Sequence, residues 1–533
     1  MVQGTGLLGR LRRKRPDLSW GSPLFNAILL LALVLAGLAI ARLPLTLAGA
    51  LVLGGIVLLA TLVRPEYGLY LLVLAVPFGG VREVTIAGFT VGAAEALIGL
   101  ALAAWMARMV AAREIRIVRP PLLLPLLAFL GATLLSTTGA LSLRWSLKEI
   151  VKWLEVLAIY LFVASALDRD KARVVVALAL LAGIGQALLG VYQFLGRVGP
   201  EAFVLLGRFM RAHGTFEQPN PYGGYLGLVL PLAYGVLLGT RTFGIREFVD
   251  SWVHRESANP ESTNLRVTNS LLAILGFVLM AAALAMSWSR GAWLGFAAAF
   301  AAMNLVHSRR TAALFVLACL LAVLLGGFQL LPRALVQRFA DIAPYLGIFD
   351  VRGVKVTDEN YALVERMAHW QAAWGMFNDR PWLGVGIGNY EPVYPAYALP
   401  GWGEPLGHAH NYYLNIAAEA GLVGLAAYLL LWGAAFWEAW RTVRGTEGYW
   451  RGVAVGIFGA LVHLSVHNFF DNLYVHNMYV HVAILLGLLY VVGQQTATPR
   501  RNSGNLSPQR GQAPASKEVS PCQGCFAASE EMP

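Results

Sequence analysis

The chain has few charged residues. Of its 533 residues only 13% are Asp, Glu, Lys or Arg, whereas 57% are hydrophobic. A soluble domain carries about 25% charged residues, so this composition excludes a soluble globular protein and requires apolar surface that faces lipid. Cysteine is also scarce: Cys319 lies in an apolar run, and the Cys522-x-x-Cys525 pair lies in a polar tail. This pattern does not support a disulfide framework.

Long apolar runs recur along the chain. A helix needs about 20 predominantly apolar residues to cross the ~30 Å hydrocarbon core of a bilayer. We therefore predict an all-α polytopic membrane protein with about 12–14 transmembrane helices and one large periplasmic loop domain. The expected spans are 24–41, 45–63, 67–80, 90–110, 120–137, 147–167, 172–192, 220–239, 269–288, 291–306, 311–331, 411–436, 452–470 and 474–494. The third is short and holds Pro77, Gly79 and Gly80, as a half-helix or re-entrant segment would.

The net charge is +11. The positions of the basic residues along the chain fit a membrane topology, so we expect the lipid bilayer and not nucleic acid as the partner. If the basic N-terminus is cytoplasmic, most Lys and Arg residues of the short loops fall on that side, as the positive-inside rule requires. Both termini are then cytoplasmic. The expected regions are a basic N-terminus (1–23), the first eleven spans (24–331), an extracytoplasmic loop domain (332–410), the last three spans (411–494) and a disordered tail (495–533). Within the loop domain, apolar spacing predicts an amphipathic helix from Glu365 to Phe377.

Polar residues at the membrane edge gather on the outer side. Charges within a membrane are costly, so these groups are candidates for function. They precede or follow outer-side spans: Arg144, Lys148, Arg211, His213, Asn220, Arg290, His408, His410, Asn411, His467, Asn468 and Asp471. Arg forks bind phosphate oxygens in bidentate fashion and His transfers protons near neutral pH, so this combination suits a pyrophosphate site.

Several of these residues also have a structural interpretation. Arg144 and Lys148 can snorkel to lipid phosphate, and Asn220 or Thr215 can cap the following helix. Arg290 lies in a turn of only a few residues that gives little structural reason for a cation, which favours function.

A metal site is a further interpretation of the outer-side histidines. His408 and His410 would bind a metal if a third ligand came from His463, His467 or His476. The outer side carries no clustered Asp motif for a divalent cation. We therefore expect a site without metal or cofactor.

The motifs resemble those of the bacterial O-antigen ligases and the related O-antigen polymerases. His410-Asn411 is followed by nine residues, then Gly421 and, after two more, Gly424, which matches the ligase signature H-[NSQ]-x9-G-x2-[GTY]. Arg290 and Leu294 match the family's R-x3-L feature. Looser matches are Gly214-Thr-Phe-x-x-Pro-Asn220 and Arg366-x3-Trp370, which leads to the segment 381–388. The resemblance extends over residues 140–490.

The resemblance implies an inverting, metal-independent glycosyltransferase of the bacterial inner membrane. Its donor would be a glycan on undecaprenyl pyrophosphate, and its acceptor a hydroxyl of a lipid, a glycan or a protein. On this interpretation His410 deprotonates the acceptor and Arg290 stabilises the leaving group. The implied helpers in pyrophosphate binding are Arg211, Arg144, Lys148 and Arg366. The implied acceptor and support residues are His213, Asn220, Asn411, His408 and His467.

Two alternatives remain open from the sequence. A polymerase that joins lipid-linked repeats would share this fold and these motifs. A flippase or transporter would use the carboxylates Glu95, Glu155 and Glu419 as ion or proton relays. The gathering of polar groups at one face favours the enzyme, because transporters bind substrate near the bilayer midplane. An alternative role for Asn411 is to cap the following helix, and Gly421 and Gly424 are expected to allow close helix packing.

Overall fold

A computed structural model describes residues 22–81, 84–86, 89–114, 117–205, 207–240, 260–327, 350–357 and 360–494. Four parts of the sequence interpretation therefore lie wholly or largely outside the described residues. They are the basic N-terminus, the connection between the spans 220–239 and 269–288, the first part of the loop 332–410, and the tail with Cys522 and Cys525.

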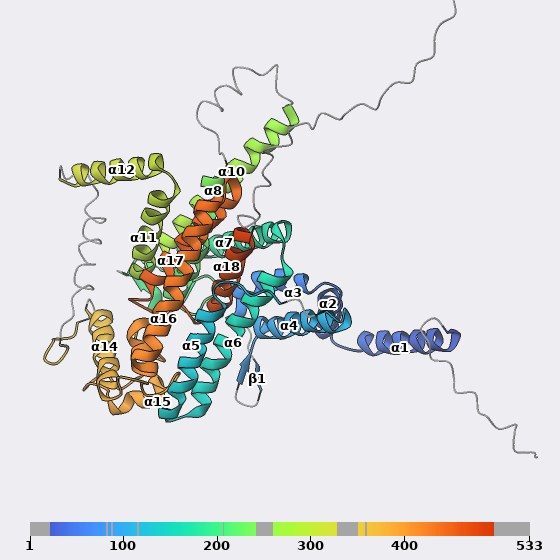
Figure 1. Ribbon diagram of the computed structural model, residues 1–533, viewed down its shortest axis with the longest axis horizontal. Coiled ribbons are helices and arrows are strands. Elements are labelled where there is room, and N and C mark those ends of the chain that lie inside the picture. The colour runs from blue at the N-terminus through green and yellow to red at the C-terminus, as the bar shows by residue number, and fades with distance from the viewer. Residues whose placement is uncertain are drawn as a thin grey trace, which may run out of the picture. The chain divides into compact units, whose positions relative to one another are not determined.

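A helix lies at each of the fourteen predicted spans (Figure 1). These helices are α1 (Pro23–Ala41), α2 (Leu45–Val63), α3 (Pro65–Ala75), α4 (Ala93–Ala111), α5 (Leu123–Ser136), α6 (Leu143–Ala166), α7 (Arg169–Gly196), α8 (Pro219–Gly239), α10 (Pro260–Met286), α11 (Arg290–His307), α12 (Arg309–Gly327), α16 (Tyr412–Gly445), α17 (Gly448–His467) and α18 (Met478–Gly493). By length and composition, six of the described helices can cross a membrane: α2, α4, α7, α8, α16 and α17. The all-α polytopic fold is therefore confirmed.

Strands are short among the described residues. One antiparallel hairpin joins β1 (Val84–Ile86) to β2 (Phe89–Val91), and another joins β3 (Val204–Leu205) to β4 (Phe209–Met210). The short third span is an interrupted helix: α3 ends at Ala75 and a 3-10 segment, η2 (Val76–Val81), follows it. Further 3-10 turns are η3 (Thr137–Gly139), η4 (Glu201–Phe203) and η6 (Tyr394–Ala396).

Helices α8 and α17 pack backbone against backbone, because glycines face each other across the contact. A Cβ added at Gly235 would lie 2.3 Å from the carbonyl oxygen of Gly452, and one at Gly239 would lie 2.7 Å from that of Gly448. Small residues at such positions let membrane helices approach closely. The helices run antiparallel, since Gly224 near the start of α8 faces His467 at the end of α17. This packing brings the outer-side residues of both helices together.

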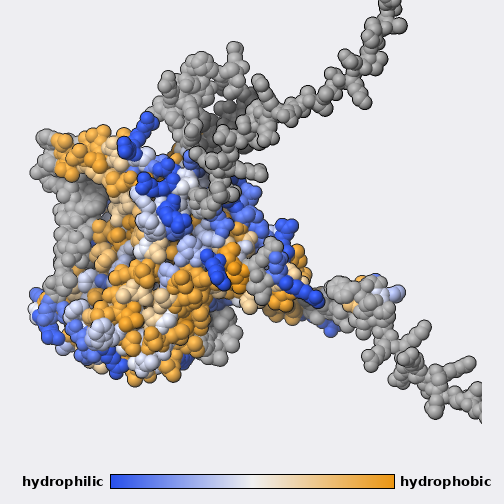
Figure 2. Space-filling model, in the orientation of Figure 1, coloured by the Kyte–Doolittle hydropathy of each residue, from blue (hydrophilic) through white to orange (hydrophobic). Residues whose placement is uncertain are grey.

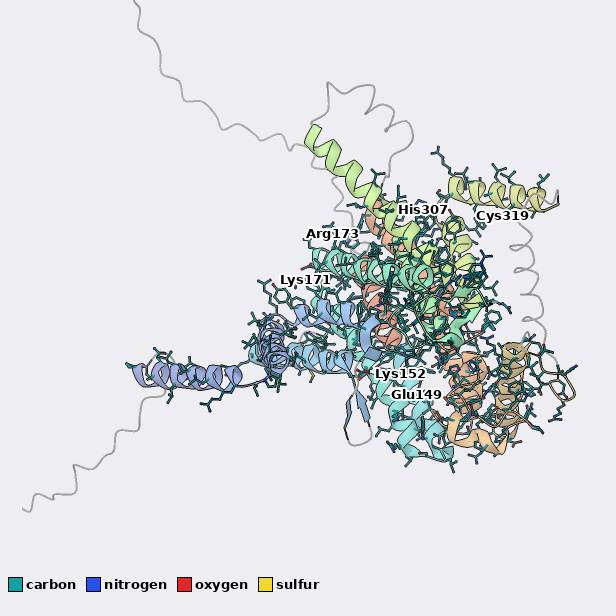
Figure 3. The ribbon with its side chains drawn as sticks, turned by 180° about the vertical axis from the view of Figure 1, so that it is seen from behind. Glu149, Lys152, Lys171, Arg173, His307 and Cys319 are labelled. Atoms are coloured by element: carbon teal, nitrogen blue, oxygen red, sulfur yellow. The ribbon has the colours of Figure 1, made fainter. Side chains whose placement is uncertain are left out.

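The surface of the helices is largely apolar. Leu, Val and Ile side chains of α2 and α12 are exposed, and Figure 2 shows apolar residues over much of one face. Lipid solvates such a surface, whereas water would not. Charged side chains lie toward the ends of the helices: Figure 3 shows Glu149 and Lys152 at the opposite end from Lys171 and Arg173. The first half of α6 and the start of α7 thus carry separate groups of charges.

The second half of the loop 332–410 forms a cap on α16. It holds α14 (Tyr361–Asp379), the predicted amphipathic helix, and the short α15 (Tyr390–Val393). α14 packs beside α16 (Figure 1). The segment between α14 and α15 pairs with α16 through hydrogen bonds from Val385 N to the Ala418 oxygen and from Gly386 N to the Glu419 oxygen, both 2.9 Å.

These bonds form where α16 is kinked at Gly421, whose φ of 64° and ψ of −163° are not helical. A Cβ at Gly421 would lie 2.3 Å from the carbonyl carbon of Trp382. The expectation that Gly421 serves helix–helix packing is therefore wrong. This glycine supplies a backbone conformation that only glycine adopts readily, and it lets the cap approach α16. Gly424 lies one turn further on, where an added Cβ would meet Ala420 of the same helix.

Candidate active site

His408, His410 and Asp471 meet at the end of the helices where α16 begins and α17 ends. The two histidines end the cap just before α16, and Asp471 lies in the turn after α17. Asp471 Oδ1 is 3.7 Å from His408 Nε2 and 3.8 Å from His410 Nδ1. A backbone hydrogen bond of 2.8 Å from Tyr412 N to the Asn468 oxygen holds the two segments together. Both distances to Asp471 exceed hydrogen-bond range, as is common for catalytic contacts before substrate binds.

Asn411, between His410 and α16, is a helix cap. Its side-chain oxygen accepts hydrogen bonds from the backbone N–H groups of Tyr413 and Leu414, at 3.0 and 3.1 Å. This confirms the structural interpretation of Asn411. His410 itself has a φ of 51°, a left-handed conformation that costs about 1–3 kcal/mol in a residue other than glycine. The cap and the surrounding packing therefore impose the position of His410.

The hydrogen bonds of His408 determine which nitrogen carries its proton. Its Nδ1 accepts a 3.0 Å hydrogen bond from the backbone N–H of His410, so in the neutral ring Nε2 carries the hydrogen and faces Asp471. Burial lowers the pKa of His408 to about 4, and the nearby His410 adds to this effect while Asp471 opposes it. At neutral pH His408 is an uncharged donor toward Asp471.

Asp471 is ionised. Burial alone would raise its pKa, but the contact with His410 and the neighbouring His408 and His467 rings hold the pKa of Asp471 well below its ordinary value. A carboxylate beside Nδ1 of His410 favours the tautomer with hydrogen on Nδ1, and this leaves the Nε2 lone pair to accept a proton.

The three side chains also have the composition of a metal site, since their ligand atoms lie within 4.8 Å of one another. The tautomer of His408 argues against this use. A metal needs the lone pair of His408 Nε2, but the hydrogen bond to Nδ1 places the proton on Nε2. The chemistry of this donor set therefore fits a histidine–carboxylate pair better than a metal centre.

Arg211 is fixed beside the turn that precedes Arg290. Its Nε donates to the Ser287 oxygen at 2.9 Å, and its Nη2 donates to Asn220 Oδ1 at 3.0 Å. The prediction that Asn220 or Thr215 caps the next helix is wrong, because α8 begins at Pro219 with Gln218 at the cap position. Asn220 orients Arg211 instead, and Thr215 bonds to Gln186 at 2.9 Å.

Arg290 begins α11, and the next residue links it to the histidines. A Cβ at Gly291 would lie 3.0 Å from His467 Cδ2, so the first turn of α11 packs directly on His467. His467 is buried and lies 3.4 Å from His463, measured between Nδ1 and Nε2. Backbone N–H groups at a helix start attract anions. The half-buried Arg290 therefore begins a helix whose first turn packs on His467 and favours a nearby anion.

The other predicted basic residues approach the site from two sides. Arg366, on α14, lies close enough for its charge to lower the pKa of His408. Lys148, on α6, lines a pocket of about 180 Å³ with Gly407 and Asn472, the neighbours of His408 and Asp471. Arg144 lies one helical turn before Lys148 with its side chain exposed.

His213 has a structural environment. Its backbone N–H donates to Gln193 Oε1 at 3.1 Å, and its ring packs edge-on against Phe203. Burial lowers the pKa of His213, although the Arg211 carbonyl opposes this. The described contacts of His213 hold the loop that carries Arg211. His213 therefore supports the position of Arg211.

The comparisons with known proteins cover part of this site. Residues 275–429 match the family model described as O-antigen ligase. This segment is therefore similar to O-antigen ligases. It includes Arg290, Arg366 and His410. No protein of curated function matches the chain.

Sequence reasoning missed two residues of this candidate site. Asp471 was one of several polar groups at the last outer turn and had no assigned role, although it is the acidic residue nearest to the His467-Asn468 pair. His369 was hidden in the amphipathic pattern of α14. Its ring is buried and packs edge-on against His410, with ring centroids 5.3 Å apart. The only sequence signal for His369 was its polar side chain among the apolar residues on one side of this helix.

Proposed function

We propose that this protein transfers a glycan from undecaprenyl pyrophosphate to an acceptor hydroxyl, without a metal and with inversion at the anomeric carbon. One observation carries the proposal: the first turn of α11, which begins at Arg290, packs on His467, four residues before Asp471, the partner of His410. Arg211 bonds to the Ser287 carbonyl in the turn just before Arg290. Two cations and a histidine base at one place are what this reaction needs.

In the proposed reaction the His410–Asp471 pair transfers the proton, and the arginines stabilise the leaving group. The acceptor hydroxyl gives its proton to His410 Nε2 as its oxygen attacks the anomeric carbon. The bond from that carbon to the phosphate oxygen breaks, and undecaprenyl pyrophosphate leaves with the bonding electrons. Arg290 and Arg211 stabilise the negative charge that develops there, with Lys148, Arg366 and Arg144 placed to assist. Asp471 stabilises the imidazolium of His410 until the proton passes to water.

The proposed location is the periplasmic face of the bacterial inner membrane, with both termini in the cytoplasm. The distribution of Lys and Arg along the chain supports this side, because it follows the positive-inside rule. Both ends of the long outer loop would then lie on the same side as Arg290.

The transporter alternative is the weaker proposal, because each of the three carboxylates that suggested it has a hydrogen-bond partner with a structural role. Glu95 accepts a hydrogen bond from Gly92 N at 2.9 Å, at the start of its helix. Glu155 accepts one from the Tyr479 hydroxyl at 2.7 Å. Glu419 accepts one from Tyr390 N at 2.9 Å, and so secures the cap on α16.

The test uses purified protein and undecaprenyl-pyrophosphate oligosaccharide with separate acceptors: a second donor molecule, a lipid-linked core glycan, a cell-wall glycan and a protein. We expect release of undecaprenyl pyrophosphate together with a product of opposite anomeric configuration, read by NMR of the new linkage. Extension of the second donor would identify a polymerase. Retention of configuration, or no transfer to any acceptor, would contradict the proposal.

A further inference from the structure

Beyond the residues assigned so far, His369 has unusual surroundings for a histidine. It lies on the inner side of α14 with 1% of its side chain exposed. Its Nδ1 is 2.9 Å from the Tyr390 hydroxyl, and its ring stacks on Tyr394 with centroids 4.7 Å apart and an interplanar angle of 19°. Both tyrosines are fully buried. His369 is therefore held from two directions.

The held ring is in contact with the candidate base. The rings of His369 and His410 meet edge-on at an interplanar angle of 82°. The next residue of α14 reaches the same target, because Trp370 Nε1 donates to the His410 carbonyl at 3.3 Å. Two consecutive residues of one helix thus contact both the ring and the backbone of His410.

His410 needs such support, since its left-handed backbone persists only where the surroundings impose it. Asp471 Oδ1 lies 3.8 Å from Nδ1 of His410. The ring centroids of His408 and His410 are 4.5 Å apart. His369 lies at 5.3 Å as a third contact. Ring orientation matters for proton transfer, because a displacement of about 1 Å can lower a rate by about 10²-fold.

We propose that His369 is a positioning residue, which fixes the imidazole of His410 in the orientation for proton transfer without touching substrate. The inference rests on the proposed role of His410 as the base. The Tyr390 hydroxyl and the Tyr394 ring extend the same support by holding His369. Glu419 completes it, because it binds the backbone of Tyr390 and thereby ties the cap to the membrane helix α16.

The test compares His369→Ala, which removes the ring, with Tyr390→Phe, which removes only the hydroxyl on Nδ1. We expect His369→Ala to lower kcat by about 10²-fold with little change in KM, and Tyr390→Phe to lower it less. His307→Ala is the matched control, because His307 lies at the end of α11 near the cytoplasmic-side Arg451. It should retain wild-type kcat.

A second measurement does not depend on glycan transfer. Diethyl pyrocarbonate modifies accessible imidazole nitrogens, and both nitrogens of His410 are buried. Mass spectrometry should show severalfold faster modification of His410 in His369→Ala, and an unchanged rate in His307→Ala. This measurement keeps its meaning even if wild type transfers no glycan. A wild-type modification rate in His369→Ala and Tyr390→Phe would overturn the proposal, even if kcat falls. Wild-type kcat in both variants would also overturn it.

Discussion

The carboxylate of Asp471 lies 3.8 Å from Nδ1 of His410, although the two residues come from segments on opposite sides of α16 and α17 in the sequence. The contact joins the outer loop to the last outer turn. It gives the histidine of the family signature a partner that fixes its tautomer. The role of His410 thus depends on the tertiary fold as well as on its own motif.

Replacing Asp471 tests this relationship. Asp471→Asn preserves size but removes the negative charge that stabilises the imidazolium of His410. We expect kcat for glycan transfer to fall by about 10²-fold or more, with KM for the donor nearly unchanged. Asp170→Asn is the matched control, since Asp170 is exposed and pairs only with Arg173 among its described contacts. Equal kcat in both variants would remove Asp471 from the mechanism.

Arg211 is expected to act through its guanidinium fork and not through charge alone. Lysine keeps the charge but cannot bind both the Ser287 oxygen and Asn220 Oδ1 while reaching a phosphate. Loss of a charged hydrogen bond costs about 1.5–3 kcal/mol, so Arg211→Lys should lower kcat/KM for the donor about 10- to 100-fold. Steady-state kinetics against Arg197→Lys, an exposed arginine at the end of α7, provides the comparison. A wild-type value for Arg211→Lys would mean that the fork is not used.

Gly421 is expected to be intolerant of a side chain. Gly421→Ala places a Cβ against the Trp382 backbone and forces alanine to a φ of 64°, so the variant should lose about 1–3 kcal/mol of stability. Gly433→Ala is the control, because it lies in the same helix with open space around its Cβ position and should be neutral or slightly stabilising. Thermal unfolding in detergent measures both. Similar unfolding temperatures for the two variants would show that the kink does not require glycine.

Acidification should destabilise the cap through His369. Burial lowers the pKa of His369 to about 3, and the nearby His410 and His408 contribute to this. The unfolded chain takes up a proton near pH 6.5 whereas the folded chain does not, so stability falls as the pH drops from about 6.5 toward about 3. The loss for this residue is about 1.4 kcal/mol per pH unit.

The corresponding measurement is the unfolding temperature from about pH 7 to about pH 5. His369→Phe keeps an aromatic ring but cannot be protonated, so its unfolding temperature should fall less steeply than that of wild type. The slopes are compared, and not the absolute temperatures, because Phe also removes the bond to Tyr390. Parallel slopes would show that His369 does not carry the effect.

The helices could be predicted from sequence because each apolar run is long enough to form its own helix. The amphipathic helix predicted at 365–377 from apolar spacing lies within α14, which is a few residues longer. His410 and Arg290 were identified from motif residues and their position at span ends. The pairing of Arg211 with Asn220 was not predicted, since it depends on how the loop before α8 turns. The role of Gly421 was also missed, because a left-handed residue inside an apolar helix leaves no periodic signal. Asp471 was missed because its turn is joined to the histidines by a tertiary contact, the backbone bond from Tyr412 to Asn468, which no local pattern reveals.

The most direct measurement is glycan transfer from undecaprenyl-pyrophosphate oligosaccharide by purified protein with EDTA present, comparing wild type with His410→Ala and Arg290→Ala. Circular dichroism and unfolding temperature establish that the variants are folded. The account predicts that wild type remains active in EDTA and that each variant loses transfer by about 10²–10⁴-fold. Transfer that persists in both folded variants, or wild-type activity that EDTA abolishes and a divalent metal restores, would contradict it.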